Sequence, residues 1–263
     1  MSPDPREIFD RDATHVWTGA ASGRGAVPGT RSLSLEERAR TRTLPAPRAG
    51  WYAATRTAVR EVLGRYLEQP PGEILLGRSP CPGCGSAAHG PPAVLAPATT
   101  LTFSLSYSGP RWLLALTSIR PLGVDVQEVL PGAGPDLTRM AASCFAPDEL
   151  GEFQARSAPA SRAAYFYRAW TRKEAVVKAM GVGLAADLTG VHVSAGTPGP
   201  AVVRTRRAGH TALWQVEDLP VSGGPGFAAL AREASAAGPV RFFVHEPAEP
   251  DPEIRQNPAT AAA

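Results

Sequence analysis

The sequence has few cysteines, almost no lysine and no long apolar run, and each shortage excludes something. Its three cysteines cannot all pair within the chain, which indicates a reducing compartment. No apolar stretch approaches the roughly 20 residues that a membrane-spanning helix needs. Residues 4–12 carry four acidic side chains and no apolar segment, so no secretory signal is expected. We therefore expect a soluble, cytoplasmic protein with no membrane partner.

A strong net charge is also absent. The formal charge is +3, and Lys173 and Lys178 are the only lysines among 27 basic residues. Aromatic residues make up 7% of the chain and no basic cluster is present, so a nucleic-acid partner is not expected. A weak basic excess suits an anionic ligand or an acidic protein partner. With 43% hydrophobic residues, the 263-residue chain should be globular, with one large domain or two small ones.

The periodicity of apolar residues predicts an α+β protein. Helices are predicted at residues 35–42, 51–67, 137–144, 147–155 and 162–180. Strands are predicted at residues 15–18, 101–106, 112–119, 122–126, 191–194, 201–204, 212–216, 226–231 and 240–244. Ser34 and Glu37 have capping-box spacing, and residues 108–110 have the chemistry of a hairpin turn. The order contains no repeated β-α-β unit, which indicates helices packed on antiparallel sheets.

One carboxylate stands out because it lies inside an apolar strand. Asp125 belongs to the predicted strand at residues 122–126. Aspartate is depleted in strands and costly to bury alone, so it needs a partner or a metal ion. About fifty residues later, Trp170, Glu174 and Lys178 recur at helical spacing and share one helix face. Taken alone, an ordinary surface Glu–Lys pair explains this second segment equally well.

Together, the two segments resemble the 4'-phosphopantetheinyl transferase superfamily. The chain length resembles the larger two-lobed branch of that superfamily, the type of the surfactin-synthetase activator. The resemblance covers about residues 16–244 and is most specific at residues 123–127 and 170–178. It implies a monomer with two pseudo-symmetric lobes, in which helices pack on antiparallel sheets. The expected lobes are residues 14–120, on the coenzyme A nucleotide side, and residues 121–245, with the catalytic helix. Residues 246–263, rich in proline, alanine and acid, are expected to form a disordered tail.

The resemblance also implies an activity. The enzyme would transfer 4'-phosphopantetheine from coenzyme A to a serine of an apo acyl or peptidyl carrier protein, and release adenosine 3',5'-bisphosphate. Such carriers serve fatty acid, polyketide or nonribosomal peptide synthesis. Cleavage of the pyrophosphate bond calls for a divalent cation, and Mg²⁺ prefers carboxylates, phosphate oxygens and water. Asp125 and Glu174 match the metal ligands of the family, and Gln127 stands at a third position that is often acidic.

Further residues match functional positions of the family. Glu149 matches a carboxylate that acts as the general base or orients water, although an ordinary exposed helix-start residue is the alternative. Lys173 and Lys178 are candidates for contact with the pyrophosphate, and Lys178 is expected to be catalytic together with Glu174. On the nucleotide side, Arg56 and Ser106 match residues near coenzyme A, and Tyr107 is expected to contact coenzyme A from the position of a family histidine. The arginines of residues 38–42 either reach the 3'-phosphate or form a solvated helix face.

Three departures from the family pattern stand in this sequence. Tyr107 replaces a histidine that contacts the 3'-phosphate, Pro91 replaces a basic residue, and Gln127 replaces a carboxylate. They support an alternative in which the chain is a degenerate homologue that binds coenzyme A or a carrier domain without catalysis. The residues that oppose that alternative are those that remain intact, namely Asp125, Glu149, Lys173, Glu174 and Lys178.

One cysteine motif lies outside this pattern of activity. Cys81, Cys84 and His89 look like half of a zinc site. A structural zinc ion needs four protein ligands, and Cys144 is the only remaining cysteine. We therefore expect a reduced loop here, without metal.

Overall fold

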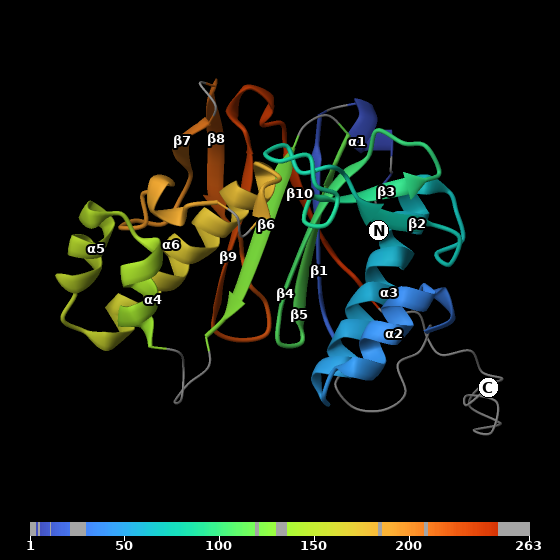
Figure 1. The fold of residues 1–263 in the computed structure, drawn as a ribbon, viewed down its shortest axis with the longest axis horizontal. Helices are drawn as coiled ribbons and strands as arrows, with labels where there is room; N and C mark the ends of the chain where they lie inside the picture. Colours follow the sequence, from blue (N-terminus) through green and yellow to red (C-terminus); the bar gives the residue numbers. More distant parts are fainter. Residues whose placement is uncertain are drawn as a thin grey trace.

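The structure is a computed structural model that describes residues 4, 6–10, 12–21, 30–118, 121–129, 136–183, 186–207 and 210–246. Two halves lie side by side, each with a four-stranded sheet (Figure 1). Helices α2 and α3 accompany one half and α4, α5 and α6 the other. Apart from Glu246, the tail expected at residues 246–263 lies outside the described residues.

Among its described residues, the first part of the chain contains three α-helices and five strands. They are α1 (Arg6–Asp10), β1 (Thr14–Ala20), α2 (Leu35–Thr43), α3 (Arg48–Leu67), β2 (Leu75–Arg78), β3 (Pro92–Ala96), β4 (Thr102–Ser108) and β5 (Arg111–Thr117). The second part contains β6 (Leu122–Glu128), α4 (Leu137–Cys144), α5 (Pro147–Gln154), α6 (Pro159–Ala179), β7 (Ala201–Arg207), β8 (His210–Asp218), β9 (Gly226–Glu233) and β10 (Val240–Val244). Among the described residues, no helix is both long and apolar enough to cross a bilayer.

The predicted α+β class is confirmed, and most of the predicted elements are present. The prediction of a strand at residues 191–194 is wrong, because this segment does not pair with a neighbouring strand. Its alternation reflects burial of Val191 and Val193. Its backbone groups bond to buried side chains instead of a neighbouring strand: the Val193 N–H donates to Glu149, and the Val191 carbonyl accepts from Lys173. The short β2–β3 hairpin was not predicted.

The two large sheets have the strand orders β10-β1-β5-β4 and β6-β9-β8-β7. Neighbouring strands are antiparallel except β1 and β10, which run parallel with Val16 beside Phe242. Strand β10 therefore lies in the sheet of the first half, although the predicted lobe of residues 121–245 includes it. The predicted domain limits as a whole stay a prediction.

Three hydrophobic clusters hold these layers together. One packs α3 against the first sheet through residues such as Leu63 and Trp112. Another packs α6 against the second sheet through residues such as Val176 and Val216. The third lies between the two sheets and includes Val124 of β6. Full burial of each such side chain contributes about 1.5–3 kcal/mol, so the third cluster fixes how the two sheets meet.

Serine hydroxyl groups join the edge strands β4 and β6. Alternate serines of β4 accept hydrogen bonds from backbone N–H groups of β6: Ser104 from Val124 at 3.1 Å, Ser106 from Val126 at 3.2 Å and Ser108 from Glu128 at 3.0 Å. Because side chains alternate along a strand, all three hydroxyls face the same way. They satisfy edge N–H groups that would otherwise lack a partner, and they set the register between the two halves.

A close approach between β6 and α6 explains the glycine two residues before Asp125. A Cβ atom on Gly123 would lie 1.9 Å from the Ala175 carbonyl oxygen and 2.5 Å from the Ala179 nitrogen. Only glycine allows the strand to touch the helix backbone at this point. The contact places Asp125 beside the part of α6 that carries Glu174 and Lys178.

A candidate site where the two halves meet

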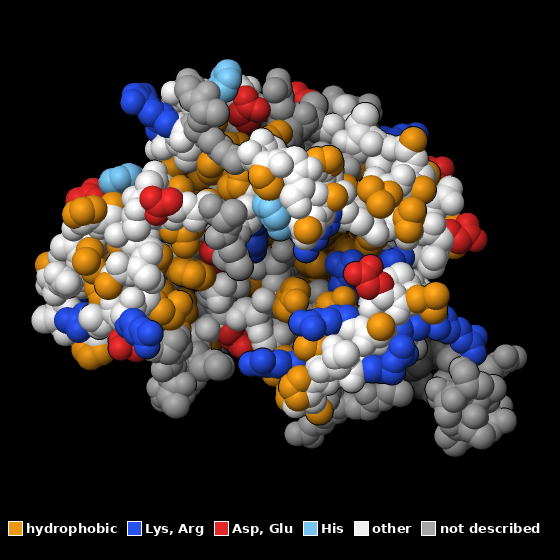
Figure 2. Space-filling view, in the orientation of Figure 1, with side chains coloured by type: hydrophobic (Ala, Val, Ile, Leu, Met, Phe, Trp, Pro, Cys, Tyr) orange, Lys and Arg blue, Asp and Glu red, His pale blue; other side chains and the backbone are white. Residues whose placement is uncertain are grey.

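A cleft of about 1640 Å³ is lined by residues from both halves of the molecule. Its walls come from α2, α3, the β2–β3 hairpin with its loop, β4, the end of α6, and β7 with β8. Figure 2 shows the hollow near the centre of one face, with basic side chains beside it. The basic residues of the lining are Arg40, Arg56, Arg60, Arg78 and Lys178. The volume exceeds the roughly 300–1,000 Å³ of common small-molecule pockets, so the cleft suits a large anionic ligand.

Asp125 is buried next to this cleft, and its carboxylate accepts hydrogen bonds from three side chains. The Ser106 hydroxyl donates to Oδ1 at 2.7 Å and the Gln127 amide donates to Oδ2 at 3.1 Å. The Lys178 ammonium donates to Oδ1 at 2.6 Å. Asp125 is only 2% exposed, so these donors supply the compensation that a buried carboxylate requires.

Glu174 differs from Asp125 because its carboxylate is not fully paired. It is 9% exposed, and its buried Oε1 has no hydrogen-bond partner among the described residues. Burial raises the pKa of Glu174, the charge of Asp125 raises it further, and Lys178 partly opposes the rise. Two buried carboxylates that repel each other, one with an unpartnered oxygen, fit the preference of a hard divalent cation for oxygen ligands. The donor set therefore fits Mg²⁺.

Lys178 connects Asp125 to the cleft. It lies at the end of α6, and its side chain is 27% exposed and contributes to the cleft lining. Besides its contact with Asp125, its ammonium donates to the Val124 carbonyl at 3.0 Å. The structure thus brings Lys178 and Glu174, which share one helix face, together with Asp125. Asp125 and Glu174 themselves are not part of the cleft lining.

Glu149 and Lys173 form a separate ion pair inside the second half. Lys173 is fully buried, and its ammonium lies 2.7 Å from Oε2 of Glu149. The other oxygen of Glu149 accepts from the Val193 N–H at 2.8 Å, and Lys173 also donates to the Leu188 and Val191 carbonyls. The pair fastens α5 and residues 188–193 to α6. Neither residue lines the cleft, which differs from the base and pyrophosphate contacts expected of them.

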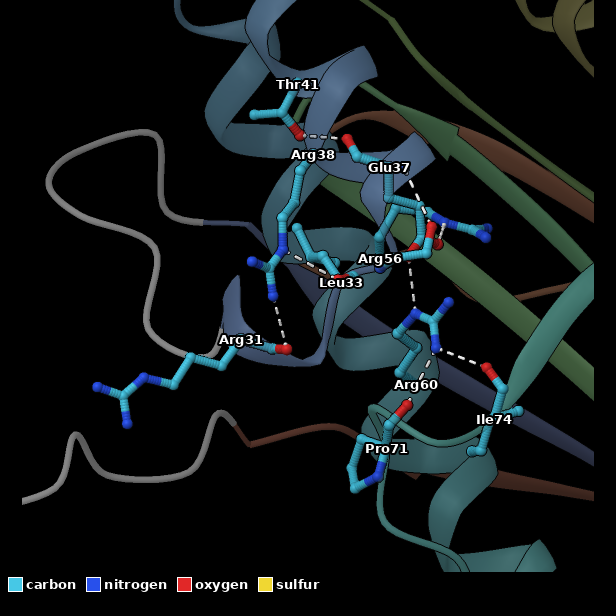
Figure 3. Close-up of polar contacts among 10 residues, drawn as sticks. Arg31, Leu33, Glu37, Arg38, Thr41, Arg56, Arg60, Pro71 and Ile74 are labelled. Carbon is cyan, nitrogen blue, oxygen red and sulfur yellow. Dashed lines mark hydrogen bonds and ion pairs between the residues drawn. The ribbon is translucent and has the colours of Figure 1, made fainter. Parts of the chain in front are cut away.

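Arg56 lines the cleft as part of an acid–base cluster on α2 and α3 (Figure 3). Glu37 accepts from Arg56 Nε at 2.6 Å, from Arg60 Nε at 2.8 Å and from the Ser34 N–H at 2.9 Å. Burial raises the pKa of Glu37, but the charge of Arg56 and these hydrogen bonds outweigh it and lower the pKa overall. Among the described residues, the contact with Glu37 uses only Nε of Arg56, which leaves its terminal nitrogens for a ligand.

The other residues expected on the nucleotide side have different positions. Tyr107 is 52% exposed and lines the cleft, as expected for a ligand contact. Ser106 is buried behind it and bonded to Asp125, so the structure gives it a contact other than the expected phosphate. Of the arginines at residues 38–42, only Arg40 lines the cleft. Arg38 donates to backbone carbonyls on the other side of α2 (Figure 3).

Sequence reasoning missed several charged residues of this region. Arg60 is 2% exposed and donates to Glu37 and to the carbonyls of Pro71 and Ile74. The capping box predicted a contact of Glu37 with Ser34, but nothing local indicated that two arginines of the next helix would share it. Arg78 lines the cleft from the unpredicted hairpin. Its side chain donates to the Gly90 carbonyl across the loop that follows β2, and no pattern along the chain indicates this contact.

Comparison with known proteins bears on this site. Residues 121–231, which contain Asp125 and Glu174, match the family model of the 4'-phosphopantetheinyl transferase superfamily. A Synechocystis protein, named provisionally as a 4'-phosphopantetheinyl transferase, is 30% identical over 179 residues, covering 67% of this chain and 68% of the relative. A Bacillus subtilis 4'-phosphopantetheinyl transferase is 34% identical over 86 residues, covering 33% of this chain and 36% of the relative.

A third relative is the 4'-phosphopantetheinyl transferase AcpT of Salmonella typhi. It is 37% identical over 112 residues, which cover 42% of this chain and 56% of the relative. The chain thus spans between about a third and two thirds of the length of these curated relatives.

Proposed function

Because this chain belongs to the 4'-phosphopantetheinyl transferase superfamily, we propose that it transfers 4'-phosphopantetheine from coenzyme A to a serine of an apo carrier protein. The serine oxygen would form a bond to the phosphorus of the pantetheine arm, and the pyrophosphate bond would break to release adenosine 3',5'-bisphosphate. The observation that carries the proposal is a buried, incompletely paired carboxylate, Glu174, which lies beside Asp125 and next to a basic cleft.

Asp125 and Glu174 would hold a divalent cation, with Mg²⁺ as the expected ion. When bound, this cation supplies positive charge that offsets the charge developing on the leaving phosphate. The protein prepares for it by aligning Asp125 with three donors and by keeping Glu174 Oε1 without one among the described residues. Gln127 already donates to Asp125, so its role would be to orient that carboxylate.

The cleft would take coenzyme A with its phosphates toward the basic side chains. Arg40, Arg56 and Arg78 provide positive charge from α2, α3 and the β2–β3 hairpin. Lys178 would contact the pyrophosphate, because its ammonium lies at the junction of the cleft and Asp125. Charge-assisted hydrogen bonds of this kind are roughly twice as strong as neutral ones.

Glu149 and Lys173 would act as positioning residues. Each is buried and paired with the other, and together they anchor residues 188–193 to α6. The helix that presents Glu174 and Lys178 is held in place by this anchor. A general-base role for Glu149 would require its carboxylate to leave a 2.7 Å contact with Lys173.

The proposed transfer can be tested by intact-protein mass spectrometry of the acceptor. The protein is incubated with coenzyme A, Mg²⁺ and several apo acyl or peptidyl carrier proteins. We expect the mass of at least one carrier to rise by one phosphopantetheine group, and a carrier with alanine at the acceptor serine to stay unchanged.

The matched variants are Glu174→Gln, which should abolish the modification, and Glu152→Gln, which should keep it. Glu152 is a suitable control because its side chain is 58% exposed on α5, away from the cleft. Tight binding of coenzyme A with no modified carrier would contradict the proposal and favour a homologue that binds without catalysis.

A further inference from the structure

Three potential metal ligands meet in the loop between β2 and β3, outside the carboxylate site. They are Cys81, Cys84 and His89, and one ligand atom from each lies within 4.8 Å of the others. The sulfur of Cys84 is 3.1 Å from Nε2 of His89. Cys81 is 3% exposed, whereas Cys84 and His89 are exposed. In the described part of the chain, no other group of three His, Cys, Asp or Glu residues comes this close.

The backbone of the loop holds the two cysteines in a tight turn. The Gly85 N–H donates to the Cys81 carbonyl at 2.8 Å, and the Cys81 N–H donates to the Ser86 carbonyl at 2.8 Å. The Gly83 N–H points at the sulfur of Cys81, 3.4 Å away. An N–H group directed at a sulfur stabilises the thiolate form, which is the form that binds metal. The turn therefore already holds the Cys81 sulfur in an arrangement that suits binding of a cation.

His89 is brought back to the cysteines by the glycine that follows it. A Cβ atom on Gly90 would lie 1.7 Å from the Ser79 carbonyl oxygen and 2.9 Å from the Cys81 nitrogen. Only glycine fits there, and the Gly90 carbonyl accepts from Arg78 at 2.7 Å. The two ends of the loop are thus fixed against each other at the position where His89 meets the cysteine turn.

We propose that Cys81, Cys84 and His89 bind a zinc ion, with water at the fourth tetrahedral position. Two thiolates and a neutral imidazole balance the charge of Zn²⁺, and sulfur and imidazole are its preferred ligands. A structural zinc ion usually has four protein ligands, but three protein ligands with water at an open fourth position form the other common zinc arrangement. Exposure of Cys84 and His89 gives water access to that position.

The ion would stiffen one wall of the cleft. His89 and Gly90 belong to the cleft lining. Pro82 and Pro91 of the loop pack against Gly181 in the turn after α6. A Cβ atom on Gly181 in that turn would lie 3.1 Å from Pro82 and 3.3 Å from Pro91. A single ion would therefore tie the loop of the first half into a fixed shape where it meets the second half.

Metal content of the full-length chain tests the zinc site. The protein is supplied with Zn²⁺, dialysed against metal-free buffer and analysed by inductively coupled plasma mass spectrometry. We expect about one zinc ion per wild-type chain and background levels in Cys84→Ser and in His89→Gln. Two controls should retain the ion: Cys144→Ala, in the buried core of the second half, and His210→Ala, an exposed histidine of the same cleft.

Affinity and spectroscopy make the test specific. Competition with a chelating dye should show Zn²⁺ affinity at least about a hundredfold weaker in Cys84→Ser and His89→Gln, because changes outside the ligand shell alone cost about 10–100-fold. Co²⁺ in place of Zn²⁺ should give thiolate-to-cobalt absorption in the wild type and lose it in Cys84→Ser. Far-ultraviolet circular dichroism checks that both variants are folded.

Three results would overturn the zinc site. The first is equal zinc content in the wild type and in folded Cys84→Ser or His89→Gln. The second is a wild-type chain that retains no zinc under these conditions. The third is a thiol count in the chelated, unreduced protein that shows Cys81 and Cys84 joined as a disulfide. None of these readouts depends on carrier modification, so the zinc site and the transferase proposal stand or fall separately.

Discussion

Replacing Glu174 by glutamine and Asp125 by alanine should change the stability of the metal-free protein in opposite directions. Glu174 carries a buried charge with an oxygen that has no partner among the described residues. Asp125 is also buried but accepts from Ser106, Gln127 and Lys178. Removal of the first charge relieves a penalty, whereas removal of the second carboxylate takes a buried acceptor away from three donors.

The size of each change follows from these contacts. An unsatisfied buried polar group costs about 1–3 kcal/mol, and glutamine still buries an amide, so Glu174→Gln should gain about 1 kcal/mol. For a chain of this length, that gain raises the melting temperature by about 2–4 °C. Asp125→Ala should lose about 2–3 kcal/mol. This is less than the cost of breaking a fully buried ion pair, because the side chain of Lys178 is 27% exposed.

The pH dependence of the Glu174 effect has a definite sign. Burial raises the pKa of Glu174 above its ordinary value of about 4.5, so the folded state holds this proton more tightly than the unfolded state. Below that ordinary value the carboxyl group is neutral in both states and carries no penalty. As the pH rises through the raised pKa, the penalty appears. The advantage of Glu174→Gln should therefore be largest at neutral pH and vanish toward acid.

Differential scanning calorimetry with a chelator and then with Mg²⁺ measures both effects. Mg²⁺ should raise the melting temperature of the wild type and leave both variants unchanged, because an ion that binds only the folded state stabilises it. The Glu152→Gln variant should follow the wild type throughout. The reasoning is refuted if Glu174→Gln destabilises the metal-free protein as much as Asp125→Ala does.

Three further predictions concern neighbouring positions. Gln127→Ala should keep most transfer activity, because it removes only one hydrogen bond to Asp125. Gln127→Glu should tighten the Mg²⁺ dependence of transfer. A Mg²⁺ titration that finds Gln127→Ala inactive would make the amide a direct metal ligand. Tyr107→His should increase the ratio of kcat/KM for coenzyme A over 3'-dephospho-coenzyme A, since a charged imidazole bonds phosphate more strongly than a phenol. A ratio already in the thousands for the wild type and unchanged in the variant would show that other groups hold the 3'-phosphate. Lys173→Met should lower the free energy of unfolding, measured in urea, by about 3–5 kcal/mol because it leaves the buried charge of Glu149 without its partner. Adding Glu149→Gln should recover most of this loss. Full transfer activity of the folded Lys173→Met single variant would argue against a positioning role for the Glu149–Lys173 pair.

Local patterns in the sequence predicted the structural features that depend on residues close to one another along the chain. The period of α6 placed Glu174 and Lys178 on one face, and the strand pattern placed Asp125 in a buried position. The capping box of Ser34 and Glu37 is present as predicted. The resemblance to a family linked the strand to the helix, and the backbone contact at Gly123 is the physical reason that they meet.

Contacts between segments that are distant along the chain could not be predicted from such local patterns. The alternation at residues 191–194 has the period of a strand, but the buried Glu149–Lys173 pair takes the backbone groups that a neighbouring strand would use. Likewise, nothing local indicated that β10 would pair with β1. His89 approaches Cys84 because the loop closes at Gly90, which depends on tertiary contacts of the β2–β3 hairpin.

The most direct test of the transferase proposal measures both products of one reaction while Mg²⁺ is titrated in. Holo-carrier is quantified by mass and adenosine 3',5'-bisphosphate by chromatography, with the wild type and Glu174→Gln in parallel. The proposal predicts equal amounts of the two products, a dependence on Mg²⁺, and neither product from Glu174→Gln. Coenzyme A bound without turnover, or cleaved without a modified carrier, would contradict it.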